Sequence, residues 1–158
     1  NRFGIILKKN LAENSTLTCL PKFCKGFFID KHAERKVTKT FVDLLNTKTP
    51  SIDQMLMNLS GGNQQKVAIG KWLIGDSEII IFDEPTRGID VGAKQEIYEL
   101  MNRLVNEGKS IIMISSEMTE ILRMSDRIIV MCEGKITGEL DIKDATQEKI
   151  MHLATLRS

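Results

Sequence analysis

The stretch Leu59–Lys66, which reads Leu-Ser-Gly-Gly-Asn-Gln-Gln-Lys, decides how this chain is interpreted. Two adjacent glycines follow a serine and open a segment, 61–74, whose apolar residues recur at helical spacing. Serine is a good N-cap residue, and the free N–H groups of a first helical turn attract anions. Glycine also lets a ligand come close to the backbone. The stretch therefore predicts a helix N-terminus that is presented to a phosphate group.

A second chemical signal is Ile79–Glu84, which reads Ile-Ile-Ile-Phe-Asp-Glu. Its apolar run is too short for a helix and does not alternate, which predicts a buried strand over 78–83. Asp83 and Glu84 would then lie at the carboxyl end of a sheet, where ligands bind in open α/β folds. One carboxylate can hold a hydrated Mg²⁺ and the other can activate a water molecule. Alone, this pattern is also compatible with acidic residues that merely end a strand.

Residues 1–58 are predicted to be mainly helical. Asp30 is a good N-cap for an amphipathic helix over 31–46, and a capping-box pattern at 51–54 predicts a short helix over 52–57. We expect this part to form a helical subdomain, with the helix that follows Ser60 belonging to a second segment, 59–75.

Residues 76–158 alternate strands and helices. Asp90 and Ser116 are expected N-caps, and short apolar runs predict strands over 111–114 and 127–132. Glu133-Gly134 indicates a tight turn into a β-hairpin. The alternation predicts an α/β fold with a mostly parallel sheet, right-handed crossovers and a C-terminal hairpin.

The composition excludes several classes of protein. The 158 residues are 42% hydrophobic and 27% charged with a net charge of +1, so no basic field indicates a nucleic-acid partner. No apolar run is long enough to span a bilayer, so a membrane role would have to be peripheral. The three cysteines form no metal-ligand pattern and are expected to be free thiols.

The two stretches in this order and at this spacing resemble the nucleotide-binding cassette of ABC transporters. There the first is the signature motif, and the second is the Walker B strand followed by the D-loop. Asn63–Ile69, Pro85–Lys94 and Ile114–Met118 are further similar to the C-terminal cassette of monosaccharide importers of the ribose and galactose type. The resemblance implies a P-loop NTPase fold in a subunit that couples ATP hydrolysis to sugar uptake at the cytoplasmic face of the membrane. In that group two cassettes are fused in one polypeptide.

The resemblance also assigns roles by position. The signature residues would contact an ATP held by the opposite cassette, with the Ser60 hydroxyl and the Gly62 N–H on its γ-phosphate. The residues assigned to this contact are Ser60, Gly61, Gly62, Asn63 and Gln64. Asp83 would hold Mg²⁺ through water, Glu84 would be the general base, and Asp90 would lie at the seam between cassettes. The implied partners are the fused N-terminal cassette, membrane-spanning permease subunits and, indirectly, a sugar-binding receptor.

The chain departs from the family pattern in two respects. Ser116 stands where most cassettes carry the switch histidine, and Asn63 replaces the common Gln of the signature. These departures imply unequal sites, in which this half donates its signature to a competent site on the other half.

No phosphate-binding loop of the form Gly-x-x-x-x-Gly-Lys-Ser/Thr occurs in the chain. We expect that loop, and the N-terminal half of the cassette, to lie upstream of Asn1. We therefore expect the chain alone neither to bind nor to hydrolyse ATP appreciably.

Two other function classes remain open from the sequence. DNA-repair and chromosome-organising ATPases also carry a signature and a Walker B strand, although no heptad run precedes Ser60 here. A non-catalytic binding module is the other alternative, because the chain lacks a phosphate-binding loop of its own.

Overall fold

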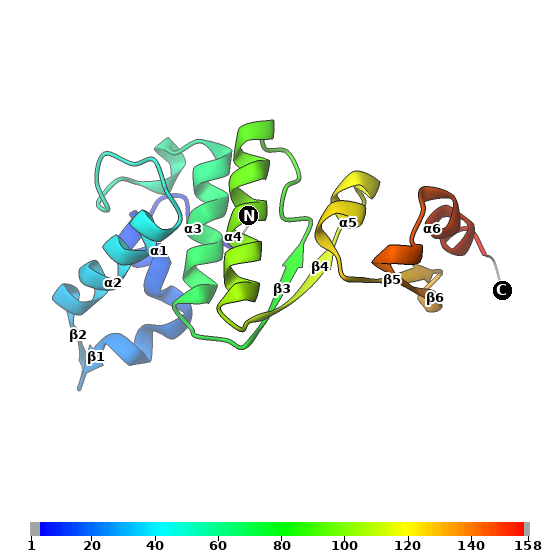
Figure 1. The fold of residues 1–158 in the computed structure, drawn as a ribbon. Coiled ribbons are helices and arrows are strands. Elements are labelled where there is room, and N and C mark those ends of the chain that lie inside the picture. Colours follow the sequence, from blue (N-terminus) through cyan, green and yellow to red (C-terminus); the bar gives the residue numbers. More distant parts are fainter. Residues whose placement is uncertain (1–3, 157–158) are drawn as a thin grey trace. The chain divides into compact units, whose positions relative to one another are not determined.

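The structure is a computed structural model that describes residues 4–156 (Figure 1). It contains two compact units. The first comprises the residues up to Ile80 together with Thr86–Ile111, and the second comprises Ile81–Pro85 together with the residues from Ile112 on. The signature stretch belongs to the first unit and the acidic strand end belongs to the second.

The first unit is built mainly from helices, of which α3 follows the signature serine and lies beside α4 (Figure 1). Its helices are α1 (Leu11–Thr16), α2 (Lys31–Leu44), α3 (Gly61–Leu73) and α4 (Val91–Asn106). Helices α1, α2 and α3 pack against one another. Apolar side chains from α1, from α3 and from the segments that precede these two helices form a buried cluster, consisting of Ile5, Leu11, Leu56, Leu59, Val67 and Ala68. The N-cap Ser60 and the first turn of α3, together the signature turn, are therefore supported by this packed apolar cluster.

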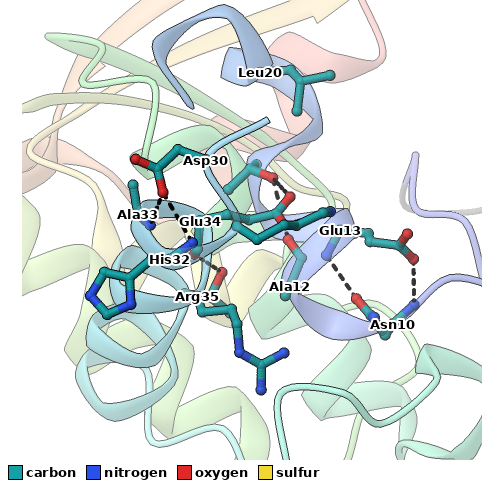
Figure 2. Close-up of polar contacts among 12 residues, drawn as sticks. Asn10, Ala12, Glu13, Leu20, Asp30, His32, Ala33, Glu34 and Arg35 are labelled. Carbon is teal, nitrogen blue, oxygen red and sulfur yellow. Dashed lines mark hydrogen bonds and ion pairs between the residues drawn. The ribbon is translucent and has the colours of Figure 1, made fainter. Parts of the chain in front are cut away.

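Capping side chains determine where α1 and α2 begin (Figure 2). Asn10 and Glu13 form a reciprocal capping box at the start of α1. The Asp30 carboxylate accepts hydrogen bonds from His32 N and Ala33 N at the start of α2. The expected helix over 31–46 is therefore confirmed within two residues of its end.

The short helix expected over 52–57 is wrong. Ser51 Oγ does accept from Asp53 N, but the backbone then forms a turn, and only a 3₁₀ helix, Leu56–Asn58, follows. Arg35 of α2 holds the Asp53 carboxylate at both oxygens, 2.5 and 2.8 Å away. This contact ties the turn to α2 and takes the place of a continued helix.

A small antiparallel hairpin precedes α2. A 3₁₀ helix, Leu17–Phe23, leads into strand β1 (Cys24–Lys25), which pairs with β2 (Phe28–Ile29). Lys25 Nζ lies 2.8 Å from the Asp30 carboxylate, so the hairpin also contacts the N-cap of α2.

Asp30 gives the first prediction, an acid-dependent loss of stability. The pKa of Asp30 is lowered from 3.8 to about 2, because Lys25 and then the backbone N–H of Ala33 donate hydrogen bonds to its carboxylate. A depressed pKa stabilises the fold above the unfolded pKa, and that contribution disappears as the pH falls through the folded pKa. In urea unfolding, the wild type should lose more stability than Asp30→Asn between about pH 4 and about pH 2. The asparagine still caps but does not titrate, so equal acid slopes would contradict this account.

Strands β3 (Ile79–Asp83) and β4 (Ser110–Ile114) form a two-stranded sheet. The N–H of Ser110 at the start of β4 bonds to Glu78 O before β3, and Glu84 N after β3 bonds to Ile114 O at the end of β4. The start of β4 therefore lies beside the start of β3, and the ends of the two strands also lie side by side. The two strands are thus parallel, as the sequence predicts.

Strand β3 is less buried than its continuous apolar run suggests. Buried Ile80 and Phe82 alternate with Ile79 and Ile81, which are 60% and 64% exposed. The described residues supply no covering layer on that face of β3.

The second unit contains a β-hairpin on which two helices pack. Strands β5 (Arg127–Cys132) and β6 (Lys135–Asp141) are antiparallel, and both turn residues, Glu133 and Gly134, have positive φ angles of 49° and 80°. This is the geometry of a type I′ turn and confirms the expected hairpin. Within residues 4–156, β5 pairs only with β6. Helices α5 (Met118–Met124) and α6 (Gln147–Ala154) pack on the hairpin core, which contains Ile128, Val130 and Ile150.

Candidate functional site

The N-termini of α3 and α4 border one cavity of about 180 Å³ in the first unit. Its lining combines the N-cap serine, the N-cap aspartate of α4, and charged side chains from nearby segments. The residues are Lys48, Ser60, Gly62, Asn63, Lys66, Asp90, Gly92, Ala93 and Glu96. Four of the residues predicted from the sequence therefore meet at one place.

Ser60 caps α3 and remains exposed. Its Oγ lies 2.9 Å from Asn63 Nδ2 and 3.4 Å from Asn63 N, and it accepts from both. The first N–H groups of a helix have no intrahelical acceptor, which leaves the N–H groups of Gly61 and Gly62 available to a ligand. The arrangement is therefore suited to an anion with several oxygens.

The two signature glycines meet different surroundings. A Cβ added at Gly61 would have no neighbour within 4 Å, whereas a Cβ at Gly62 would lie 3.1 Å from Ala93 Cβ. Gly62 thus permits the close approach of α3 and α4. Gly61 leaves an open surface at the helix start.

This difference predicts that alanine is tolerated better at position 61 than at position 62. Gly61→Ala should leave the free energy of unfolding unchanged or raise it by up to about 1 kcal/mol, because alanine favours the helix. Gly62→Ala should be less stable than Gly61→Ala by about 1 kcal/mol or more, because the new methyl group pushes against α4. Urea unfolding of both variants tests this contrast. Equal stabilities would mean that the contact with Ala93 relaxes without cost.

Gln64 is engaged within the chain. Its Nε2 donates to Leu56 O and to Leu59 O, each at 3.0 Å. These bonds fix the backbone that leads into Ser60, so this amide holds the signature turn in place.

Asp90 caps α4, accepting from Ala93 N at 3.0 Å. That N–H is the main reason why the pKa of Asp90 is lowered, and the Gly92 N–H and the charge of Lys48 add to it. Asp90 therefore stays ionised beside the cavity.

Two further residues of this cavity were not singled out in the sequence. Lys48 lies between the helix expected over 31–46 and the capping-box pattern at 51–54, yet it lines the cavity and its backbone N donates to Asn63 Oδ1 at 2.8 Å. Lys66 is 4% exposed, bonds Asn46 O at 2.9 Å and pairs with Glu96. Lys66 is the only charged residue of the stretch Leu59–Lys66, so its charge was a signal in the sequence. No local pattern indicates Lys48.

The second unit holds the acidic strand end. Asp83 is the exposed last residue of β3, and Glu84 follows with a positive φ of 49°. Such a backbone angle is costly for a residue with a side chain and is concentrated at functional positions. Glu84 N bonds to Ile114 O at 2.8 Å, and Glu84 Oε1 accepts from Ser116 N at 2.9 Å. The structure thus brings the carboxylate of Glu84 to the backbone of Ser116.

Ser116 itself does not cap α5, contrary to the expectation. The N-cap residue is Glu117, and no side-chain bond caps the helix. The hydroxyl of the preceding Ser115 instead donates to Glu120, whose side chain is 2% exposed, and accepts from Glu117 N at 3.0 Å. This network anchors the segment that presents the Ser116 N–H to Glu84.

No group of three metal-ligating side chains occurs among residues 4–156, and no helix in that range is both long and apolar enough to cross a membrane. The Mg²⁺ ion expected at Asp83 would be held through water by a single carboxylate, and such binding does not require a group of this kind.

Comparison with known proteins decides the family. The sequence profile described as ABC transporter matches residues 4–87, which is more than half of the chain. The chain belongs to the ABC transporter family. A Burkholderia lata protein named as a ribose/galactose/methyl galactoside import ATP-binding protein is 54% identical to this ABC chain over 156 residues. A xylose import ATP-binding protein of Thermoanaerobacter pseudethanolicus is 54% identical over 154 residues.

Each alignment covers 98% of this ABC chain but only 30% of the relative. The chain therefore spans less than a third of the length of the curated relatives it matches. Its fold is that of an ATP-binding cassette. A dimeric cassette in a post-hydrolysis state, bound to ADP and Pi, superimposes with a TM-score of 0.76 over 90% of this chain and 60% of that chain, at 24% identity.

Proposed function

We propose that the chain is the C-terminal part of the ATP-hydrolysing subunit of a monosaccharide importer, and that its signature turn binds the γ-phosphate of an ATP held by an opposite cassette. The observation that carries this proposal is the start of α3. Ser60 and Gly62 line the cavity that Asp90 also lines, and Gly61 between them is exposed. The N–H groups of both glycines lie in the first helical turn, where they have no intrahelical acceptor.

The chain's own residues fit a phosphate at this place. The open space at Gly61 admits a ligand to the backbone, and the Lys48 side chain adds positive charge at the cavity. ATP supplies the reactive phosphoanhydride. The chain supplies hydrogen-bond donors that orient and partly neutralise the γ-phosphate. Asp90, ionised at the adjoining helix start, is proposed to lie at the seam with the opposite cassette.

The acidic strand end has a separate proposed task at this half's own nucleotide. Asp83 would hold Mg²⁺ through water, and Glu84 would accept a proton from the attacking water. The Ser116 N–H holds one oxygen of Glu84, leaving the other for that water. Ser116 occupies the switch-histidine position without an imidazole, so we propose that this site is the weaker of two.

The lengths of the matched proteins support a fused pair of cassettes. The chain accounts for 60% of a solved single cassette but for 30% of the import proteins, so the latter have room for about two cassettes. The names of these relatives support pentose or hexose import as the task of the whole protein. Permease subunits, a sugar-binding receptor and a position at the cytoplasmic face of the membrane follow from that task.

The test uses the full-length protein reconstituted with its permease in vesicles. ATP hydrolysis should rise when a sugar-loaded receptor is added and should not respond to double-stranded DNA. Stimulation by DNA alone would instead support the class of repair and chromosome-organising ATPases. No hydrolysis under any condition would support a non-catalytic module.

A further inference from the structure

The side-chain amide of Asn63 has only one orientation that satisfies its neighbours. Lys48 N, a backbone donor, lies 2.8 Å from Asn63 Oδ1, and Ser60 Oγ lies 2.9 Å from Asn63 Nδ2. Exchanging the amide oxygen and nitrogen would set two donors against each other at Lys48. The loop that carries Lys48 therefore fixes which end of the amide meets Ser60.

This orientation determines what the Ser60 hydroxyl can do. A hydroxyl oxygen accepts at two lone pairs and donates one proton. Both acceptor positions of Ser60 Oγ are used by Asn63, through Nδ2 at 2.9 Å and N at 3.4 Å. Within residues 4–156, the Ser60 hydroxyl takes part in hydrogen bonds only as an acceptor. The proton therefore remains for an acceptor from outside.

We propose that Asn63 is a positioning residue that keeps the Ser60 hydroxyl a hydrogen-bond donor toward a phosphate oxygen of ATP. This inference rests on the proposed function, since it concerns the same site. It gives a task to the residue at which the signature departs from the common Gln. The amide links the phosphate-facing serine to the Lys48 loop. This positioning task replaces the direct contact with ATP that the resemblance implies for Asn63.

The isosteric variant Asn63→Asp separates this task from a structural one. One aspartate oxygen can still accept from Lys48 N, and a negative side chain in the first turn of a helix is favourable. A purely structural asparagine would therefore tolerate the change. The second oxygen, however, accepts where Nδ2 donated, so the Ser60 hydroxyl turns and donates to it. The phosphate then loses its donor.

The experiment is a double-mutant cycle in the full-length protein, with ATP hydrolysis measured for wild type, Ser60→Ala, Asn63→Asp and the double variant. We expect each single change to lower kcat/KM by about 10- to 100-fold, the loss of one hydrogen bond to a charged group. In the Ser60→Ala background, Asn63→Asp should cost no more than about threefold, because the hydroxyl through which it acts is gone. The cycle also controls for simple charge repulsion, which would persist in that background.

A second measurement does not depend on turnover. With ¹⁵N-asparagine-labelled full-length protein free of nucleotide, the side-chain amide resonance of Asn63 should shift in Ser60→Ala. The thermal midpoint of Asn63→Asp should be no lower than that of the wild type. An unchanged resonance, or an Asn63→Asp protein that hydrolyses ATP within threefold of the wild type while Ser60→Ala is impaired, would overturn the inference and leave the proposed function intact. If Ser60→Ala is itself fully active, the proposed function fails together with the inference.

Discussion

Ser60→Arg in the full-length protein is expected to abolish sugar transport and to lower ATP hydrolysis by at least about 100-fold, the usual cost of losing a donor to developing negative charge. The substitution removes the hydroxyl and sets a long side chain at the exposed rim of a cavity of about 180 Å³. The guanidinium would occupy the place through which the phosphate approaches the N–H groups of Gly61 and Gly62. Steady-state hydrolysis and sugar uptake by vesicles measure the effect.

Loss of the cap on α3 must be separated from loss of the phosphate contact. Removing a serine N-cap costs about 1 kcal/mol of stability, which alone would not unfold the protein. Ser60→Asn is the matched control for the cap, because asparagine caps equally well but changes the group that meets the phosphate. Both variants should fold, and both should be impaired in hydrolysis. A Ser60→Arg protein that transports sugar would remove Ser60 from the nucleotide site.

Glu84→Gln should lower the rate of ATP hydrolysis at this half's own nucleotide by about 100- to 10,000-fold, which is the range for loss of a general base. The fold should be unaffected, because the glutamine oxygen can still accept from Ser116 N at the place that Glu84 Oε1 now occupies. The total hydrolysis of the full-length protein should nevertheless fall less than after the matching substitution in the N-terminal cassette. The proposed reason is that a serine at the switch-histidine position offers no imidazole to the γ-phosphate.

Single-turnover hydrolysis of radiolabelled ATP by the two variants compares the sites directly. The unequal-site account expects most of the phosphate release to survive Glu84→Gln and most of it to disappear in the other variant. Equal losses would mean that both sites turn over, and that the serine at position 116 does not weaken its own site.

The sequence was most informative where one short segment determines its own structure. Asp30, Ser60 and Asp90 each cap the helix that was expected to follow them, because a capping side chain bonds to N–H groups only two or three residues away. The type I′ turn at Glu133-Gly134 was predicted for the same reason.

Expectations failed where a distant residue decides the outcome. The turn after Ser51 is held by Arg35, which lies 18 positions before Asp53, so the local capping pattern did not become a helix. Ser116 presents its N–H to Glu84, 32 positions earlier, and does not cap α5.

The geometry of the candidate site was predictable only in part. The motifs placed Ser60, Gly62 and Asp90 at helix starts. The motifs did not indicate that the two helix starts border one cavity, because this depends on how α3 packs on α4. The bond from Lys48 N to Asn63 Oδ1 joins residues 15 positions apart, so no local pattern indicated that the amide of Asn63 is oriented from outside its own helix.

Photolabelling with an ATP analogue that carries an arylazide on its γ-phosphate tests the central claim most directly. In the full-length protein, the label should be recovered on the peptide that contains Ser60–Gln64, and labelling should disappear when the phosphate-loop lysine of the opposite cassette is replaced by alanine. Labelling of that peptide that survives this replacement, or the absence of label from it in an active protein, would contradict the claim that this signature turn completes a site on the opposite cassette.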